Sequence, residues 1–267
     1  MKIIVSHDID HITAFEHKNM IIPKSIIRAS IELITRKITF KEYLLRYNEL
    51  IINRWNNLDA LMEFNIEKGI PSTFFIGVNN GMGLDYTLKN SQKWIKKIQN
   101  NGFSIGVHGI NYIDYDSIKE EFDVFQKYAI ESFGIRMHYL RQNEVTFENM
   151  AKSNYLYDTT LVEDKNPYKL YNMWEFPLHI MDGHIMYQGK RWITKSLEEY
   201  KDITKKRITE LEHKNIKYLT FLFHDRYFND SFLVWKEWYM WSIEYFQSLG
   251  YEFISYNDAI NELEGKV

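Results

Sequence analysis

The sequence predicts a single α/β domain of barrel type over residues 1–267. Short apolar segments rich in β-branched and aromatic residues alternate with longer segments of helical period, about seven or eight times in 267 residues. This alternation is typical of βα units around a parallel sheet. No segment rich in Pro, Gly or Ser divides the chain. Four of the predicted strands end in His, Asp or Arg, where βα barrels place catalytic groups.

Composition excludes several classes of protein. With 45% hydrophobic and 26% charged residues, 12 Gly and 4 Pro, the chain is neither disordered nor fibrous. The 33 basic and 36 acidic residues leave a net charge of -3, so no nucleic-acid partner is expected. Cysteine is absent, which leaves His, Asp and Glu as the side chains able to bind a metal.

The apolar content does not predict a membrane segment. The N-terminal apolar run is too short for a secretory signal, and no run of about 18 apolar residues follows. We therefore expect a cytoplasmic protein that does not span a membrane. Aromatic residues make up 16% of the chain. They are expected mainly to fill a core, with a sugar-binding cleft as the alternative.

The strands are expected where short apolar runs stop at polar or turn-forming residues. These runs are residues 2–6, 72–78, 103–107, 137–141, 155–158, 173–177, 217–223 and 252–255.

Helices are expected between the strands, because the apolar residues there recur with helical spacing. The first, 41–68, is expected to break near 55–57. The others are 91–101, 117–133, 147–153, 196–214, 232–249 and 257–263. The first crossover is unusually long, and 21–38 within it is apolar or basic with helical spacing. We interpret about 14–68 as a helical insertion near the barrel mouth, with a helix pair packed on the outside as the alternative.

The first strand ends in Ser6-His7-Asp8-Ile9-Asp10-His11. Side chains alternate along a strand with a period of two, so Asp8 and Asp10 point the same way. One carboxylate can hold a metal while the other takes a proton from water. A D-x-D pair is also common in turns and helix caps, but the flanking His7 and His11 favour a functional interpretation.

Three later strands also end in titratable side chains. His108 lies close to two glycines that allow a ligand to approach, although taken alone it fits a buried core histidine better. The fourth strand ends in His138-Tyr139-Leu140-Arg141, and the penultimate strand in Leu222-Phe223-His224-Asp225. Because parallel strands end at one rim, we expect these groups to converge.

Taken in their order along the chain, five segments resemble the motifs of the polysaccharide deacetylase (NodB-homology) family, and together they span nearly the whole chain. The first motif is similar to His7-Asp8-Ile9-Asp10, the "ATFF" strand to 72–76 and the histidine motif to 102–108. The arginine motif is similar to 139–141 and the closing Leu-x-His motif to 222–225. The strings 136–141, 157–160, 175–178 and 181–182 further resemble a subgroup whose first motif reads T-H-D-V-D.

The resemblance implies a deformed (β/α) barrel of seven to eight units and metal-assisted hydrolysis of an acetamide on a sugar. By position, Asp8 would be the general base, while Asp10 and His108 would be metal ligands. His224 would be the general acid that protonates the leaving amine. Arg141 would orient and polarise Asp8.

Other side chains are assigned around these. Asp158 or Asp182 would hold the imidazole of His224 in its protonated form, and Asp158 is preferred because it ends a predicted strand. The side chains expected to contact the substrate are His7, His11, Tyr112, Tyr139 and Asp182.

Tyr112 is the important departure from the family pattern, which has a second His at this position. A neutral phenol is a poor ligand at pH 7. Either His138 or His11 supplies the third ligand, with His138 preferred, or the metal is weak or absent. We expect a weakly bound divalent ion among Zn, Mn, Mg and Co, with Mg or Mn better suited to a water-rich shell.

Three functions remain open. The first is deacetylation of an N-acetylated sugar or glycan precursor, or hydrolysis of another small amide. The second is a catalytically silent carbohydrate-binding module that keeps the deacetylase fold. The third is a structural partner in a glycan-assembly complex, which a large exposed apolar patch on the insertion would indicate.

Overall fold

The computed structural model describes residues 1–17, 21–189 and 195–266, and its centre is a curled sheet of ten strands. Nine strands follow the order β6-β7-β5-β4-β3-β2-β1-β9-β8, and β10 pairs with β1. In the described residues β6 and β7 form the one antiparallel strand pair, and β6 and β8, at the two ends of the order, are not paired with each other. The strands are β1 (Lys2–Ile9), β2 (Thr73–Ile76), β3 (Ser104–Gly109), β4 (Ile135–Met137), β5 (Tyr157–Asp158), β6 (Tyr168–Leu170), β7 (Met173–Glu175), β8 (Ile180–Met181), β9 (Tyr218–Leu222) and β10 (Glu252–Phe253).

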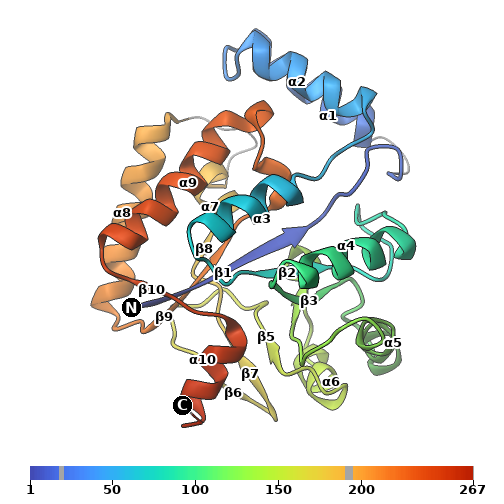
Figure 1. Cartoon of the computed structure of the whole chain (residues 1–267), viewed down its shortest axis with the longest axis vertical. Coiled ribbons are helices and arrows are strands. Elements are labelled where there is room, and N and C mark those ends of the chain that lie inside the picture. The colour runs from blue at the N-terminus through green and yellow to red at the C-terminus, as the bar shows by residue number, and fades with distance from the viewer. Residues whose placement is uncertain (18–20, 190–194, 267) are drawn as a thin grey trace.

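The helices surround this sheet, with α8 and α9 on one side and α4 and α5 on the other (Figure 1). The predicted α/β barrel is confirmed in this open, curled form. The helices are α1 (Ile21–Ile34), α2 (Phe40–Ile51), α3 (Leu58–Glu67), α4 (Leu88–Asn100), α5 (Tyr115–Gln126), α6 (Thr146–Lys152), α7 (Asp182–Tyr187), α8 (Leu197–His213), α9 (Leu233–Ser248) and α10 (Tyr256–Leu263).

Local signals in the sequence explain where several helices begin. Thr39 caps α2 and Ser196 caps α8, each in a capping box with a Glu three residues later. The expected interruption of the first long helical segment falls between α2 and α3.

The two faces of β1 have different partners, because side chains alternate along the strand. Ile3, Val5 and Ile9 belong to the main core, which the residues of α3 and α9 also enter. Ile4, on the other face, belongs to a smaller core that includes Tyr256 of α10. Ser6, Asp8 and Asp10 continue this second face toward the carboxyl end of the strand.

The fourth strand begins two residues and ends four residues earlier than predicted. It covers Ile135–Met137, and His138–Leu140 follow it as a 3₁₀ turn. Tyr139 and Leu140 have φ of 57° and 54°, a left-handed conformation that ends the strand. The shift places Arg136 inside the strand and His138 directly after its end.

The predicted insertion consists of two structurally different parts. Helix α3 packs into the main core through Leu58 and Leu61 and acts as the crossover helix to β2. Helices α1 and α2 form a hairpin at one end of the molecule (Figure 1), where Arg46 Nε donates to the carbonyl oxygen of Ser231. The hairpin exposes large apolar side chains, namely Ile27, Ile31, Ile34, Phe40, Leu44 and Ile51. Exposed apolar side chains on the insertion are the feature that the partner hypothesis named, although the exposure of individual side chains does not establish a single patch.

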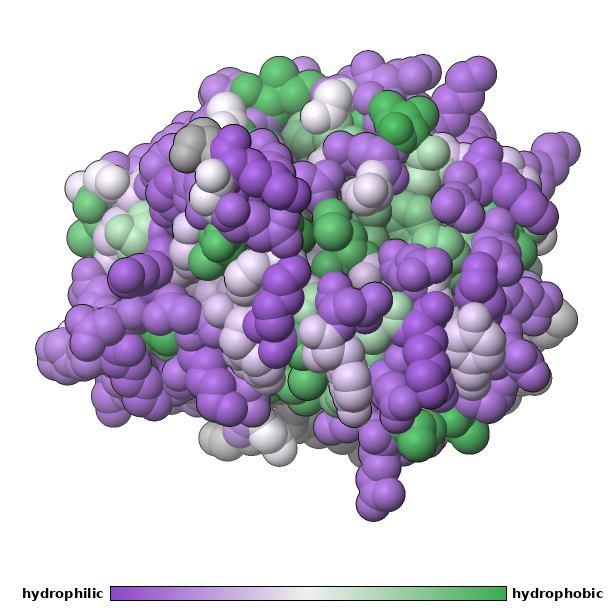
Figure 2. Space-filling model, turned by 90° about the horizontal axis from the view of Figure 1, so that it is seen from below, coloured by the Kyte–Doolittle hydropathy of each residue, from purple (hydrophilic) through white to green (hydrophobic). Residues whose placement is uncertain are grey.

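The opposite face of the molecule is mostly hydrophilic, and its apolar side chains form separate small patches (Figure 2). None of the described helices is long and apolar enough to cross a membrane.

Candidate metal centre and active site

The order of the strands brings the predicted site residues to one rim of the sheet. Asp8 lies near the end of β1 and Asp10 directly follows that strand, while His108 lies in β3 and His138 follows β4. His224 follows β9, the neighbour of β1 on its other side. Parallel strands end at the same edge, so residues far apart in sequence meet there.

Asp10, His108 and His138 converge on one point. His108 Nε2 lies 3.1 Å from Asp10 Oδ1, and His138 Nδ1 lies 3.3 Å from the same oxygen. The two histidine nitrogens are 3.0 Å apart. One possible ligand atom from each residue lies within 4.8 Å of the others. A candidate Asp-His-His metal site therefore exists, with His138 as its third member.

Hydrogen bonds on the far side of each imidazole show that this donor set fits a cation. His108 Nδ1 lies 3.0 Å from the carbonyl oxygen of Arg136, and His138 Nε2 lies 3.3 Å from that of Met82. A carbonyl only accepts, so each of these nitrogens carries the proton. In the neutral rings, His108 Nε2 and His138 Nδ1 then direct lone pairs at each other and at the Asp10 carboxylate. A divalent cation resolves this repulsion.

His224 forms a second group with Asp182 beside this centre. Its Nδ1 lies 2.9 Å from Asp182 Oδ1, and its backbone N–H donates to Asp182 Oδ2 at 2.7 Å. Its Nε2 lies 3.7 Å from Asp10 Oδ2. Burial opposes protonation, but Asp182, Asp10 and Asp8 together raise the pKa of His224 to about 10. The imidazole is therefore held as a cation.

Asp8 is ionised and paired with Arg136. Arg136 Nη1 donates to Asp8 Oδ1 at 2.7 Å, and Nη2 donates to Ser6 Oγ at 2.9 Å. Burial opposes ionisation, but Arg136, His108 and His224 hold the pKa of Asp8 below its usual value. Asp8 is 3% exposed and Arg136 is fully buried. The guanidinium therefore holds Oδ1 of Asp8 in place, while Oδ2 does not receive this hydrogen bond and can accept a proton.

These groups line a pocket of about 670 Å³. Its other walls come from the turn after β4 and from α7 and the residues around it. Tyr139, for which contact with the substrate is predicted, is among the lining residues. The lining residues are Asp8, Asp10, His108, Met137, His138, Tyr139, Leu140, Met181, Asp182, Gly183, His184, Tyr187, Gly189, His224 and Tyr227.

Two predicted roles fall on different residues in the structure. Arg141 donates to the carbonyl oxygens of His138 and Ile110 and does not reach Asp8, because the strand predicted over 137–141 ends at Met137, four residues before Arg141. Arg136 takes the role assigned to Arg141.

Asp158 is likewise not the partner of His224. It is buried in β5, accepts hydrogen bonds from Thr160 Oγ1 at 2.7 Å and Thr160 N at 3.1 Å, and lies beside Glu175. Asp182, the alternative considered from the sequence, takes this role, because β8 ends next to β9.

Three residues predicted to contact the substrate do not line this pocket, although one of them, His11, lines an adjoining pocket. His7 belongs to the opposite face of β1, fully buried, with its ring against Phe223 O and Asn65 Nδ2. His11 Nδ1 lies 2.9 Å from His17 Nε2. Tyr112 packs with its ring 5.2 Å from the Arg141 guanidinium. Neither His11 nor Tyr112 therefore joins the Asp-His-His group, and the expectation of only two protein ligands does not match the geometry.

Sequence reasoning missed Arg136 as the partner of Asp8, and it missed Tyr187 and Tyr227 in the pocket wall. Arg136 had a detectable signal, since it is a charged residue inside the apolar run of a strand. The two tyrosines had none, because aromatic residues occur throughout the sequence.

Arg136→Met is expected to lower the free energy of unfolding by about 3–5 kcal/mol, because it leaves the Asp8 carboxylate buried without its counter-charge. Urea unfolding at pH 7, followed by tryptophan fluorescence, measures this loss. Arg141→Met is the matched control, and its loss should be clearly smaller because Arg141 binds two carbonyl oxygens. Adding Asp8→Asn to Arg136→Met should restore part of the stability. Equal losses in the two single variants would contradict the assignment.

Solved proteins share this fold. A protein from Mycobacterium smegmatis described as a polysaccharide deacetylase has a TM-score of 0.63 at 14% identity, covering 98% of this chain and 88% of its own. A second, from Pseudomonas aeruginosa PAO1, has a TM-score of 0.61 at 16% identity, covering 79% and 75%. PuuE allantoinase has a TM-score of 0.63 at 14% identity, covering 96% and 87%.

Searches against protein-family models and against curated proteins give no match. The structural likeness at these identities concerns the fold. The chain therefore has the curled (β/α) barrel of the polysaccharide deacetylases of the NodB-homology type.

Proposed function

We propose that this protein is a metal-assisted amide hydrolase, and that its substrate is an N-acetylated sugar or a sugar-containing precursor. The observation that carries the proposal is the meeting, in one pocket, of an Asp-His-His group, an ionised aspartate and a protonated histidine. The shared fold with proteins described as deacetylases supports it.

Asp10, His108 and His138 would hold one divalent cation. Bound there, it would supply a Lewis acid that polarises a carbonyl group and lowers the pKa of water. The hydrogen bonds from the far nitrogens of His108 and His138 to carbonyl oxygens orient the two rings for this task.

Asp8 would accept the proton of the attacking water. Its Oδ1 receives the hydrogen bond from Arg136, whereas its Oδ2 lies 3.9 Å from His108 Nε2 and thus faces the metal group. Because the pKa of Asp8 is held below its usual value, the carboxylate is in its basic form at neutral pH.

His224 would donate a proton to the leaving amine. Asp182 binds its Nδ1, so Nε2 carries the proton that is directed toward Asp10 and the pocket. An amine leaves only when protonated, which is why an acid is needed beside the base.

A silent binding module is a weaker explanation of this arrangement. Sugar binding does not require a buried arginine that keeps a carboxylate ionised or a buried carboxylate that keeps a histidine protonated, and both cost desolvation energy. Hydrolysis of another small amide is the alternative within the same chemistry, and the likeness to the fold of an allantoinase supports including it in a test.

The test is release of acetate from a panel of N-acetylated sugars and sugar phosphates, with small cyclic and linear amides measured in parallel. Chelator-treated protein is assayed before and after one divalent ion is restored. We expect activity that requires the ion and that Asp10→Asn abolishes. If the panel is bound with the ion present and no member is hydrolysed, the binding module replaces the enzyme.

A further inference from the structure

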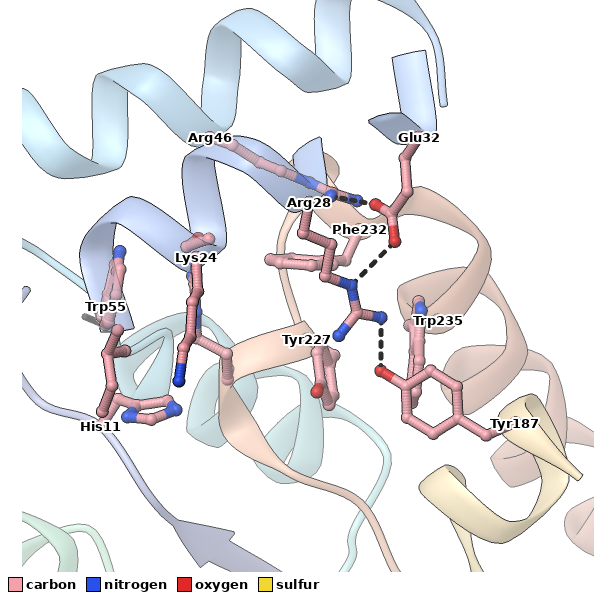
Figure 3. A pocket seen from close by; sticks show the side chains of 13 residues that line it. His11, Lys24, Arg28, Glu32, Arg46, Trp55, Tyr187, Tyr227, Phe232 and Trp235 are labelled. Carbon is pink, nitrogen blue, oxygen red and sulfur yellow. Dashed lines mark hydrogen bonds and ion pairs between the residues drawn. The ribbon is translucent and has the colours of Figure 1, made fainter. Parts of the chain in front are cut away.

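A second pocket of about 260 Å³ lies under the α1–α2 hairpin. Lys24 and Arg28 reach down into it from α1, with Trp55 beside Lys24 on one side and Tyr227 and Trp235 near Arg28 on the other (Figure 3). No role in the reaction proposed above uses this pocket.

The second pocket adjoins the catalytic pocket. Tyr187 and Tyr227 line both. Tyr187 ends α7, the helix that begins at Asp182, and Arg28 Nη2 donates to Tyr187 OH at 2.8 Å. The insertion is therefore fastened beside the catalytic pocket, and the two pockets are neighbours that share two tyrosines.

The second pocket carries a surplus of positive charge. Four basic side chains line it, namely Lys24, Arg28, Arg46 and Arg226. Glu32 accepts from both Arg28 Nε and Arg46 Nη1, at 2.9 and 2.5 Å. Glu49 lies 2.6 Å from Arg226 Nη2. Two carboxylates therefore oppose four cations in a chain whose net charge is -3.

Several donors in this pocket have no partner in the described part of the chain. Arg28 uses Nε and Nη2, which leaves Nη1. Arg226 is 8% exposed, and its buried Nη1 has no hydrogen-bond acceptor. Lys24 is exposed and makes no ion pair with a described residue. Unused cationic donors of this kind bind carboxylate or phosphate oxygens.

We propose that the second pocket binds an anionic substituent of the substrate, a phosphate or a carboxylate, while the amide lies in the catalytic pocket. This inference rests on the proposed amide hydrolysis. Tyr227 and Trp235 stack with ring centres 4.1 Å apart and form an apolar wall beside the cationic groups. The surface suits a sugar ring that carries the charge.

The experiment compares substrates that differ in charge. N-acetylglucosamine is the neutral substrate, N-acetylglucosamine 6-phosphate carries phosphate and N-acetylmuramic acid carries a carboxylate. We expect kcat/KM to be about ten- to a hundredfold higher for at least one anionic substrate, as one or two charge-assisted hydrogen bonds would give. The better of the two identifies the anion, and added salt should reduce the preference.

The double variant Lys24→Gln/Arg28→Gln should lower the ratio of anionic to neutral kcat/KM by about the same factor. Lys96→Gln is the control, because Lys96 is exposed on α4, outside both pockets. A ratio near one in the wild type, or a ratio that the double variant leaves unchanged, overturns the anion site and leaves the hydrolase intact.

Binding of N-acetylglucosamine 6-phosphate and N-acetylmuramic acid, measured by calorimetry, separates this inference from the proposed function. Binding that the double variant loses, without hydrolysis of any substrate, supports the anion site and refutes the hydrolase. Absence of both binding and hydrolysis overturns both.

Discussion

His138→Ala is expected to weaken binding of a divalent metal at least about a hundredfold, because loss of a ligand should cost no less than loss of a residue that only supports one. In the structure this histidine, and not Tyr112, stands beside Asp10 and His108. A set of one carboxylate and two imidazoles is typical of a catalytic zinc site with an open position. We therefore expect tighter binding than a two-ligand site allows.

Calorimetric titration with zinc at pH 7, together with metal analysis of protein purified without chelators, measures this effect. His184→Ala is a matched control, because His184 lines the same pocket but is not part of the Asp-His-His group. Tyr112→His should not tighten binding, since position 112 lies against Arg141. Unchanged affinity in His138→Ala combined with tighter binding in Tyr112→His would restore the two-ligand interpretation.

His224→Ala is expected to lower kcat by about a hundred- to ten-thousandfold with little change in KM, because a general acid acts mainly in the transition state. Asp182→Asn should lower kcat to a smaller extent. It removes the charge that contributes most to raising the pKa of His224 but keeps a side chain that can orient the ring.

Steady-state kinetics on whichever substrate releases acetate provides the measurement. Zinc affinity should be retained in His224→Ala, because its imidazole is not a member of the metal group. This separates loss of the acid from loss of the cation. A rise in KM with unchanged kcat would assign His224 to substrate binding instead.

Much of the fold could be predicted from local patterns. The apolar run of β1 is buried along its whole length after Lys2, and its period of two places Asp8 and Asp10 on one face. The same period places His7 on the other face, under α3 and α9, where Asn65 Nδ2 contacts its ring. The prediction that His7 contacts substrate was therefore wrong for a reason already present in the strand pattern.

The roles of Arg136 and Asp182 depend on contacts between segments that are distant in the sequence. Arg136 is stable inside a strand because Asp8, Ser6 and Tyr256, all more than a hundred positions away, accept from its guanidinium. Asp182 follows β8, a strand of two residues. So short an element carries no periodic signal, and the partner of His224 therefore could not be identified from pattern alone.

By itself, the sequence determined the alternation of strands and helices, the pair of aspartates at the end of β1 and the histidines at the ends of neighbouring strands. These features follow from side-chain periodicity and from burial of short apolar runs. Only the tertiary structure decided that His138 completes the Asp-His-His group and that Arg28 fastens the hairpin over a cationic pocket. The physical reason is that these arrangements depend on where β4 ends, four residues before the predicted end, and on charges brought together across the fold. Neither leaves a local pattern in the chain.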